Sequence, residues 1–437
     1  MTTTHHAPAG AKSPRQAAVA SLIGTMIEWY DFFVYSTAAA LVFNHLFFPN
    51  FDPTAGTLLA FSTFTAGFIA RPIGAAVFGH FGDRIGRKPM MVLTILIMGI
   101  ATVLIGCLPS YDSIGTLAPV LLVTLRIIQG LALGGEWGGA ALMSTEHAPE
   151  ANRGFFGSFT QAGLTVGLVL AMLVFLPLNL LNDAQMEAWG WRIPFLLSSI
   201  FVIVGILMRL KLTDTPDFKR VKKSNERAKM PLIEVVRKFP LQVIFMAGAS
   251  MSSGILFYLV ATYNLVYTAD GSISRSFMQI LVMTTSVLGF FVVLAAGKMS
   301  DRFPRHKVYL FGLILIAIIA VPLYGALDSG NAGFIVVTYI LATIALYIPY
   351  AVQPAFFSTV FSADVRYSGL SLGVTLGHLV GSSIAPLIAG ALVAATGSSF
   401  AVAGYLLVAT VISFVSVIVL VRLRRPAESA LEPSVAV

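Results

Sequence analysis

The sequence predicts an all-α membrane protein with twelve transmembrane helices in two pseudo-symmetric six-helix bundles. Three observations predict this fold: a charge-poor composition, a series of long apolar runs, and a loop pattern that occurs twice. Of the 437 residues, 57% are hydrophobic and only 11% are charged, whereas soluble domains carry about 25% charged residues. This composition excludes a soluble enzyme, a nucleic-acid-binding protein and a disordered chain.

Twelve apolar runs are each long enough for a helix that crosses the hydrocarbon core, which takes about 20 residues. They cover residues 17–43, 56–81, 90–108, 117–143, 154–180, 191–210, 241–267, 277–296, 308–327, 332–357, 367–395 and 400–421. The first run contains two acidic residues and lacks an evident small-residue cleavage site, so we expect a retained helix and not a signal peptide.

The runs divide into two groups of six on either side of a charged stretch. We therefore expect an N-terminal tail at 1–16, a first bundle at 17–212, a linker at 213–240, a second bundle at 241–421 and a C-terminal tail at 422–437. The single cysteine, Cys107, allows no intrachain disulfide and no cysteine-rich metal site.

Lys and Arg gather on one side of the predicted membrane. With the amino terminus inside, nearly all of the 28 Lys and Arg residues fall on the inner side, and the exceptions are Arg71, Arg126, Arg192 and Arg275. By the positive-inside rule, both termini are expected in the cytoplasm, and the chain in the inner (plasma) membrane. The basic linker is expected to be a solvated connector, with contact to anionic lipid as the alternative.

A loop pattern follows the second run and occurs again after the eighth. The copies read Gly79-His-Phe-Gly-Asp-Arg-Ile-Gly-Arg-Lys and Gly297-Lys-Met-Ser-Asp-Arg-Phe-Pro-Arg-His-Lys. Similar segments around Arg153 and Arg366 precede the fifth and eleventh runs at nearly the same separation. We interpret these matches as a duplicated six-helix unit, an architecture of transporters whose binding site lies between the repeats.

Acidic and basic residues at these helix ends predict a cytoplasmic gate. Opposite charges there can hold the inner mouth closed and release it when the halves move. The alternative, that the basic residues only set topology, explains neither the acids nor the duplication. The expected gate residues are Asp83, Arg84, Arg87, Glu136, Glu146, Arg153, Asp301, Arg302 and Arg366. For Glu136, a bond to a neighbouring backbone is an equal alternative.

Few ionisable residues lie deep within the runs: Glu28, Asp31, Arg71, Arg126, Glu136 and His378. Such residues are costly in a bilayer and are functional by default. Glu28 and Asp31 lie about 16 Å and about 21 Å along the first run and share one helical face with Tyr35. Two carboxylates this close in a low dielectric disfavour double ionisation, so one of them is expected to bind a proton.

Two arginines lie at a depth where they can pair with these carboxylates: Arg126 about 14 Å into the fourth run from the outer side, and Arg71 about 15 Å from the inner end of the second. We expect Asp31 and Arg126 to form the proton-coupling pair, with Glu28 in support. A static ion pair that fixes helix register is the alternative. Arg71 precedes Pro72, so bracing a kink is as plausible for it as a role in the site.

Polar and aromatic side chains within the runs predict the lining of a cavity. For the tyrosines an interfacial belt is the alternative, and His378 can equally bond a neighbouring helix. The candidate substrate ligands are Arg126, Arg71, Tyr35, Gln161, Tyr258, Asn264, Gln353 and His378.

Several of these segments resemble the major facilitator superfamily. They are the repeated Gly-x-x-x-Asp-Arg loop, Arg126-Ile-Ile-Gln129-Gly130 and the segment from Glu146 to Gly154. More narrowly, Glu28-Trp-Tyr-Asp31, residues 67–74, residues 129–139 and residues 189–195 resemble the metabolite:H+ symporter family, and within it the shikimate-type carriers.

The resemblance covers the whole chain and implies alternating access with proton-driven uptake of organic acids or zwitterions. Pro304 departs from the glycine usual in the second copy of the loop, which implies a more degenerate second gate.

The leading expectation is a proton-coupled symporter that imports a small organic acid, either shikimate-like or a dicarboxylate, because an intramembrane Arg suits a carboxylate. Symport of a zwitterionic solute such as betaine or proline is an alternative, although the short tail after Arg425 lacks the heptads of an osmosensing coiled coil. Proton-driven export is another. A non-transporting sensor would usually need a soluble domain longer than the linker.

The expected partners are the substrate, protons and the lipid bilayer. We expect a monomer without cofactor, metal, nucleic acid or enzymatic activity, and the sequence shows no phosphate-binding loop.

Overall fold

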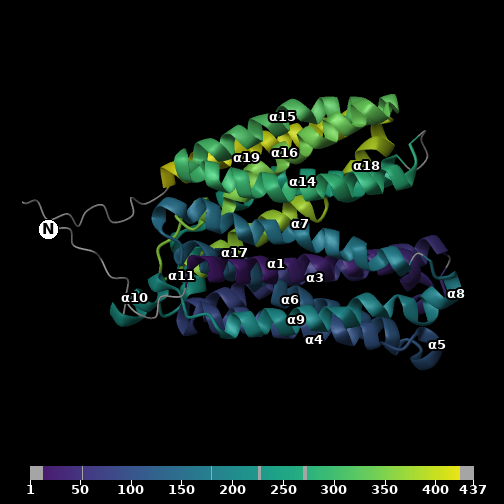
Figure 1. The fold of residues 1–437 in the computed structure, drawn as a ribbon, viewed down its shortest axis with the longest axis horizontal. Coiled ribbons are helices and arrows are strands. Elements are labelled where there is room, and N and C mark those ends of the chain that lie inside the picture. Colours follow the sequence, from purple (N-terminus) through teal and green to yellow (C-terminus); the bar gives the residue numbers. More distant parts are fainter. Residues whose placement is uncertain (1–12, 52, 179, 225–227, 269–272, 424–437) are drawn as a thin grey trace, which may run out of the picture.

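The computed structural model describes residues 13–51, 53–178, 180–224, 228–268 and 273–423 (Figure 1). Within these ranges the chain contains helices and no strand, which confirms the predicted all-α class. Most of the two predicted tails lies outside the described residues, so their boundaries stay a prediction.

The first half of the chain contains six long helical segments. They are α1 (Pro14–Ala38), continued by η1 (Ala39–Phe43) and α2 (Asn44–Phe47), then α3 (Pro53–Ile85), α4 (Arg87–Cys107), α6 (Leu117–Glu146), α7 (Arg153–Leu178) and α9 (Arg192–Leu210). Short elements lie between them: α5 (Tyr111–Ile114), η2 (Glu150–Asn152), α8 (Asp183–Gln185) and η3 (Met186–Gly190).

The second half repeats this arrangement after two short linker helices, α10 (Pro216–Ser224) and α11 (Pro231–Lys238). Its long segments are α12 (Pro240–Tyr258) with η4 (Leu259–Tyr263) and α13 (Asn264–Tyr267), α14 (Arg275–Arg302), α15 (Arg305–Ser329), α16 (Ala332–Phe357), α17 (Arg366–Gly377) with η5 (His378–Ser382) and α18 (Ala385–Thr396), and α19 (Phe400–Leu423).

These segments match the predicted spans in number and order. Among the described residues, 11 helices are long and apolar enough to cross a membrane. The 33-residue helix α3 lies where the remaining predicted span falls. Figure 1 shows two groups of roughly parallel helices, with α14, α15, α16 and α19 in one and α1, α3, α4, α6 and α9 in the other. Contacts of α7 with α14 and of α3 with α17 join the two halves.

Local sequence explains several helix ends. Ser13, Ser274 and Asn331 precede α1, α14 and α16, and each side chain accepts a backbone N–H of the first turn, which is the preferred capping geometry. Gly330 and Gly397 end α15 and α18 with φ of 64° and 67°, a left-handed conformation that costs glycine little.

Both ends of the helical array carry short elements, and we name the ends after them. The linker end is the end at which α10 and α11 lie, on the left in Figure 1. The α8 end is the opposite one, where α5 and α8 lie.

Three spans contain a π-helical turn within their predicted length, and a fourth such turn, η3, leads into α9; the sequence predicted none of them. The turns η1 and η4 follow α1 and α12, which are the first spans of their halves, and η5 begins at His378. Such turns bend a helix and are frequent at functional sites.

Candidate functional site

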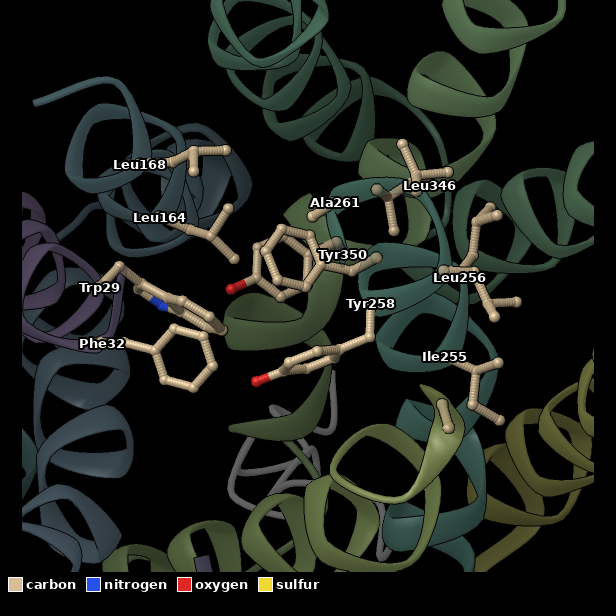
Figure 2. Packing of buried hydrophobic residues seen from close by; sticks show 14 of the residues in the cluster. Trp29, Phe32, Leu164, Leu168, Ile255, Leu256, Tyr258, Ala261, Leu346 and Tyr350 are labelled. Carbon is tan, nitrogen blue, oxygen red and sulfur yellow. The ribbon is translucent and has the colours of Figure 1, made fainter. Parts of the chain in front are cut away.

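A small central cavity lies between the two halves, and both halves contribute residues to its wall. The first half contributes Trp29, Phe68, Arg71 and Leu164, and the second half Ser253, Gly254, Phe257, Tyr258, Leu346, Tyr347, Tyr350, His378 and Ser382. Figure 2 shows the rings of Trp29 and Phe32 facing those of Tyr258 and Tyr350 across this space. Aromatic faces therefore make up much of the wall.

Three of the predicted substrate ligands line the cavity: Arg71, Tyr258 and His378. Asn264 does not line it. Its amide oxygen accepts a hydrogen bond from Tyr324 at 3.3 Å within the second half. The sequence placed Asn264 correctly on a buried helix, but the face on which it lies depends on the π-turn η4 immediately before it, which rotates the helix relative to Tyr258.

Arg71 and Glu28 form a buried pair next to the cavity. Their Nη1 and Oε1 atoms are 3.9 Å apart, and the Arg71 guanidinium lies 4.4 Å from the centre of the Phe68 ring. The other carboxylate oxygen of Glu28, Oε2, has no hydrogen-bond partner among the described residues. This loose contact leaves the Arg71 guanidinium available to a further anion, because the guanidinium fork binds two oxygens at once.

Asp31 and Arg126 do not contact each other directly, which corrects the predicted pair. The Thr102 hydroxyl on α4 donates to Asp31 Oδ2, and Gln129 Nε2 donates to that hydroxyl at 2.7 Å. Arg126 Nη1 in turn donates to Gln129 Oε1 at 2.9 Å. The carboxylate and the guanidinium are thus joined by a relay of two polar side chains, and all four residues are buried.

Tyr35 lies beside this relay and does not line the cavity. Its hydroxyl is hydrogen-bonded to Thr63, and the Arg126 guanidinium lies over its ring at 4.0 Å. The ring positions Arg126 by a cation–π contact. Thr102 and Gln129 were not among the predicted site residues, although Gln129 lies in the quoted segment after Arg126.

Gln161 and Gln353 join the two halves. Gln161 Nε2 donates to the Tyr350 backbone oxygen at 2.8 Å and to Gln353 Oε1 at 3.3 Å, and its own oxygen accepts from Trp137 at 2.8 Å. Gln353 Nε2 donates to Ser253 at 3.2 Å. These predicted ligands are therefore hydrogen-bonded to protein in this conformation, and neither of them lines the cavity, whereas their partners Tyr350 and Ser253 do.

Glu136 lies within the first half and not in the gate. Arg209 pairs with its carboxylate, and the Thr94 hydroxyl donates to it at 2.7 Å. A side chain at Gly24 would collide with Arg209, because a Cβ there would lie 1.7 Å from Nη2. The prediction missed Arg209, since an arginine in the last turn of a span was attributed to topology alone.

Two aspartates of the repeated loop bind helix ends across the halves. Asp83, at the end of α3, accepts the backbone N–H groups of Tyr367 and Ser368 at 3.1 and 2.8 Å. Asp301, at the end of α14, accepts those of Gly154 and Phe155 at 2.6 and 2.9 Å. Each carboxylate thus satisfies the exposed N–H groups and the positive dipole end of a helix in the opposite half.

The glycine that begins each copy of the loop permits this approach. A Cβ at Gly79 would lie 2.8 Å from the Cα of Ser368, and one at Gly297 would lie 2.9 Å from the backbone oxygen of Gly154. Real Cβ atoms do not approach other atoms this closely. The repeated glycine is therefore a contact position between the halves.

An ion-pair network lies beside these contacts, and we call it the linker-end network. It consists of Arg87, Glu146, Arg366 and Asp217. Glu146 pairs with Arg87 and, at 2.8 Å, with Arg366, and Arg366 pairs with Asp217 of α10 at 2.7 Å. The network connects α4, α6 and α17 with the linker. The prediction missed Asp217, because nothing in the sequence distinguishes it from other charges of the linker.

Three predicted gate arginines are not part of this network. Arg84 and Arg302 are exposed. Arg153 begins α7, where Asp301 binds backbone N–H groups and not the Arg153 guanidinium. Instead Arg305, which occupies the position of Arg87 in the second copy, donates to the backbone oxygens of Ala355 and Glu150, both at 3.3 Å.

Valine in place of Gly79 or Gly297 is expected to prevent the linker end from closing. Overpacking costs about 1–3 kcal/mol, so the closed population should fall by about one order of magnitude. Spin-label distances across the linker end measure the opening. Gly404→Val is the control, since a Cβ there meets nothing within 4 Å, and a closed distance retained in Gly79→Val would contradict the prediction.

The contact between Arg366 and Asp217 is expected to persist across physiological pH. Burial alone would raise the pKa of Asp217, but the adjacent Arg366 guanidinium lowers this pKa below its ordinary value of 3.8. A lowered pKa keeps the carboxylate charged, so its stabilising contribution is present above the ordinary value and is lost only as the pH falls through the lower one.

We therefore expect the spin-label distance between positions 219 and 307 to stay constant from about pH 8 to about pH 5. The same distance should broaden in Asp217→Asn at every pH. A wild-type distance that changes within this range would show that another group controls the contact.

Comparison with known proteins places the chain among transporters. Residues 16–243 match the family model for sugar (and other) transporters, and residues 242–436 match that for the major facilitator superfamily. The chain is 41% identical to the inner membrane metabolite transport protein YhjE of Escherichia coli (strain K12), over 86% of this chain and 87% of that protein. It is 40% identical to the shikimate transporter of the same organism, over 91% of this chain and 92% of that protein.

The fold is that of solved transporters as well. The proton:xylose symporter XylE bound to 6-bromo-6-deoxy-D-glucose superposes with a TM-score of 0.74 at 15% identity, over 94% of this chain and 95% of that chain.

Proposed function

This chain belongs to the major facilitator superfamily, and from this premise we propose that it is a proton-coupled symporter that imports a small organic acid. The chain is a multi-pass membrane transporter and not an enzyme. Its relatives include the shikimate transporter of Escherichia coli, which favours a cyclic hydroxy acid as the substrate class, with a dicarboxylate as the other acid that we consider.

The single observation that carries the proposal is the position of Arg71. Among the described residues that line the cavity, it is the one with a permanent positive charge, and it is buried among aromatic rings. An arginine binds a carboxylate through two parallel charge-assisted hydrogen bonds. In a site with few waters such a pair is stronger than at a surface. The aromatic faces of Trp29 and Tyr258 complement a ring or the apolar body of the acid.

Glu28 is proposed to compete with the substrate for Arg71. When the substrate carboxylate occupies the guanidinium, Glu28 loses its partner and is left as a buried charge, which is costly. Binding a proton removes that charge. Protonation of Glu28 therefore favours substrate binding at Arg71, and in this way Glu28 supports the coupling that we assign to Asp31.

Asp31 is proposed to carry the coupled proton, through the relay to Arg126. While Asp31 is ionised, Thr102 and Gln129 hold the carboxylate and the Arg126 guanidinium in a fixed arrangement. Protonation removes the attraction that maintains this arrangement, and α1, α4 and α6 are then free to shift. In this way the protonation of Asp31 controls when the two halves can move relative to each other.

We place the linker end in the cytoplasm, with both termini on that side, because the basic loops gather there. The linker-end network and the two aspartate contacts then form the cytoplasmic gate, which is closed in this conformation. The six-helix units at 17–212 and 241–421, joined by the linker at 213–240, are proposed as the moving bodies, and the monomer as the working unit.

A zwitterionic solute is the second candidate. Six aromatic residues line the cavity, with Trp29, Phe257 and Tyr347 among them, and aromatic faces can enclose a quaternary ammonium group. Glu28 and Arg71 also offer one charge of each sign.

Uptake into proteoliposomes with an imposed pH gradient, acidic outside, tests the proposal. Shikimate, quinate, protocatechuate, dicarboxylates, citrate and betaine form the substrate panel. We expect accumulation of at least one acid and its loss on addition of a protonophore. Accumulation of betaine alone would favour the second candidate, and substrate efflux driven by the same gradient would indicate an exporter.

A further inference from the structure

We propose that α11 is an interfacial helix that binds the anionic phospholipid surface at the linker end of the protein. The proposal concerns a surface outside the transport site and does not depend on the substrate. It rests on the exposed face of α11, on the surface that this face continues, and on the charges around it.

One face of α11 is apolar and exposed. Ile233 is 41% exposed and Val236 is 54% exposed, and Met230, immediately before the helix, is 47% exposed. Pro231 and Val235 lie on the opposite face and are buried, where α11 contacts α3, α12 and α17. The helix is thus attached to the protein by one side and presents an apolar side outward.

The exposed face continues a surface that meets lipid. Leu241 and Ile244, at the start of α12, are 51% and 61% exposed, as expected for side chains of a membrane span that face acyl chains. Phe81 and Ile85, near the end of α3, are also exposed. Figure 1 shows α11 beside the ends of the long helices and α10 farther out. The apolar face therefore lies at the depth where headgroups meet acyl chains.

Basic side chains flank this face. Lys229, in the bend before α11, and Arg237, on the helix, are both exposed, and Arg237 shares the side of Ile233, four residues earlier. Lys238 points elsewhere, because its ammonium group binds Glu234 at 2.8 Å. Apolar residues with Lys or Arg at their margins are the pattern of helices that lie in the interface of an anionic membrane.

The exposed apolar face makes it unfavourable for α11 to be surrounded by water, as the predicted solvated connector would be. Eight residues are too few for a helix that is stable in water on its own, and the buried contacts of Pro231 and Val235 use only one side. Removing the outer apolar side chains from water stabilises α11 where it lies. The lipid-bound helix also lies against α3 and α17, the two helices that Asp83 joins.

The test measures the depth of α11 in a bilayer. Nitroxide labels are placed by Ile233→Cys on α11 and, as the matched control, by Lys223→Cys on the exposed side of α10, both in a Cys107→Ser background. The full-length protein is reconstituted in nanodiscs of phosphatidylcholine with or without phosphatidylglycerol. Accessibility to oxygen, which enters acyl chains, is compared with accessibility to a water-soluble nickel chelate.

In anionic nanodiscs we expect the label at position 233 to be several-fold less accessible to the nickel chelate than the label at 223, and more accessible to oxygen. Removal of phosphatidylglycerol, or Lys229→Ala with Arg237→Ala, should reduce this difference. Equal chelate accessibility at the two positions would overturn the interfacial helix. If the label at position 233 is protected from the nickel chelate to the same extent without phosphatidylglycerol and in the doubly substituted protein, the assignment to anionic lipid is overturned.

Discussion

Asp31→Asn is expected to abolish substrate accumulation driven by a pH gradient while exchange of substrate across the membrane continues. Asparagine keeps an acceptor for the Thr102 hydroxyl but cannot change its charge. The relay to Arg126 therefore stays in one state, and proton movement no longer accompanies the movement of the halves. A protein that exchanges without accumulating has lost coupling and not binding.

Parallel measurements of accumulation under a pH gradient and of counterflow without one separate these two effects. Asp112→Asn is the matched control, because Asp112 is an exposed carboxylate on α5 far from the relay in the fold. If Asp31→Asn accumulates substrate as the wild type does, Asp31 is not the coupling group, and Glu28→Gln becomes the variant to examine.

Arg71→Gln is expected to weaken binding of a carboxylate substrate by about 10-fold to about 100-fold. The estimate follows from the loss of a charge-assisted hydrogen bond, worth about 1.5–3 kcal/mol, at about 1.4 kcal/mol per tenfold change. Arg71→Lys should recover part of the affinity, because it restores the charge without the two-pronged geometry. Concentration dependence of counterflow gives the apparent affinity.

The companion control is Arg15→Gln, which removes an exposed arginine from the start of α1. An unchanged affinity in Arg71→Gln would remove the basis for an anionic substrate at this position. Normal binding of betaine combined with lost binding of acids would instead show that the cavity accepts both and that Arg71 selects between them.

The fold was predictable because the length of an apolar run is a local property. A span of about 20 apolar residues has to be helical in a bilayer, where backbone groups bond within the segment. The order of the spans followed from the positions of the apolar runs, and the duplication followed from the loop pattern that occurs twice. The π-turns were not predictable, since no residue type in 39–43, 259–263 or 378–382 distinguishes a π-turn from an α-turn.

The charged residues of the site were predictable from the sequence, but the partners with which they form hydrogen bonds were not. Buried charges such as Glu28, Asp31 and Arg126 stand out against an apolar background. Their partners depend on small polar side chains that are common in any span, and Thr102 is one of these. For this reason the expected Asp31–Arg126 contact proved to be a relay through Thr102 and Gln129.

The partners of the predicted gate residues were also not predictable from the sequence. The two aspartates of the repeated loop were identified by their charge, and we expected arginines as partners. The structure gives them the backbone N–H groups at the starts of α17 and α7, which every helix possesses whatever its sequence. The sequence thus identifies the aspartate in such a contact, but it does not identify the backbone N–H groups that the aspartate binds.

The π-turns also set the helical phase of the spans that contain them. A π-turn holds one residue more than an α-turn, so each residue after it is rotated by about 100° relative to an uninterrupted α-helix. In the span that includes η4, Tyr258 lies before the insertion and Asn264 after it, and only Tyr258 lines the cavity. Deleting a single residue within 259–263 would bring the two segments back into register and turn a different stripe of side chains inward. The lining of this transporter is therefore encoded by a one-residue length difference as well as by residue type.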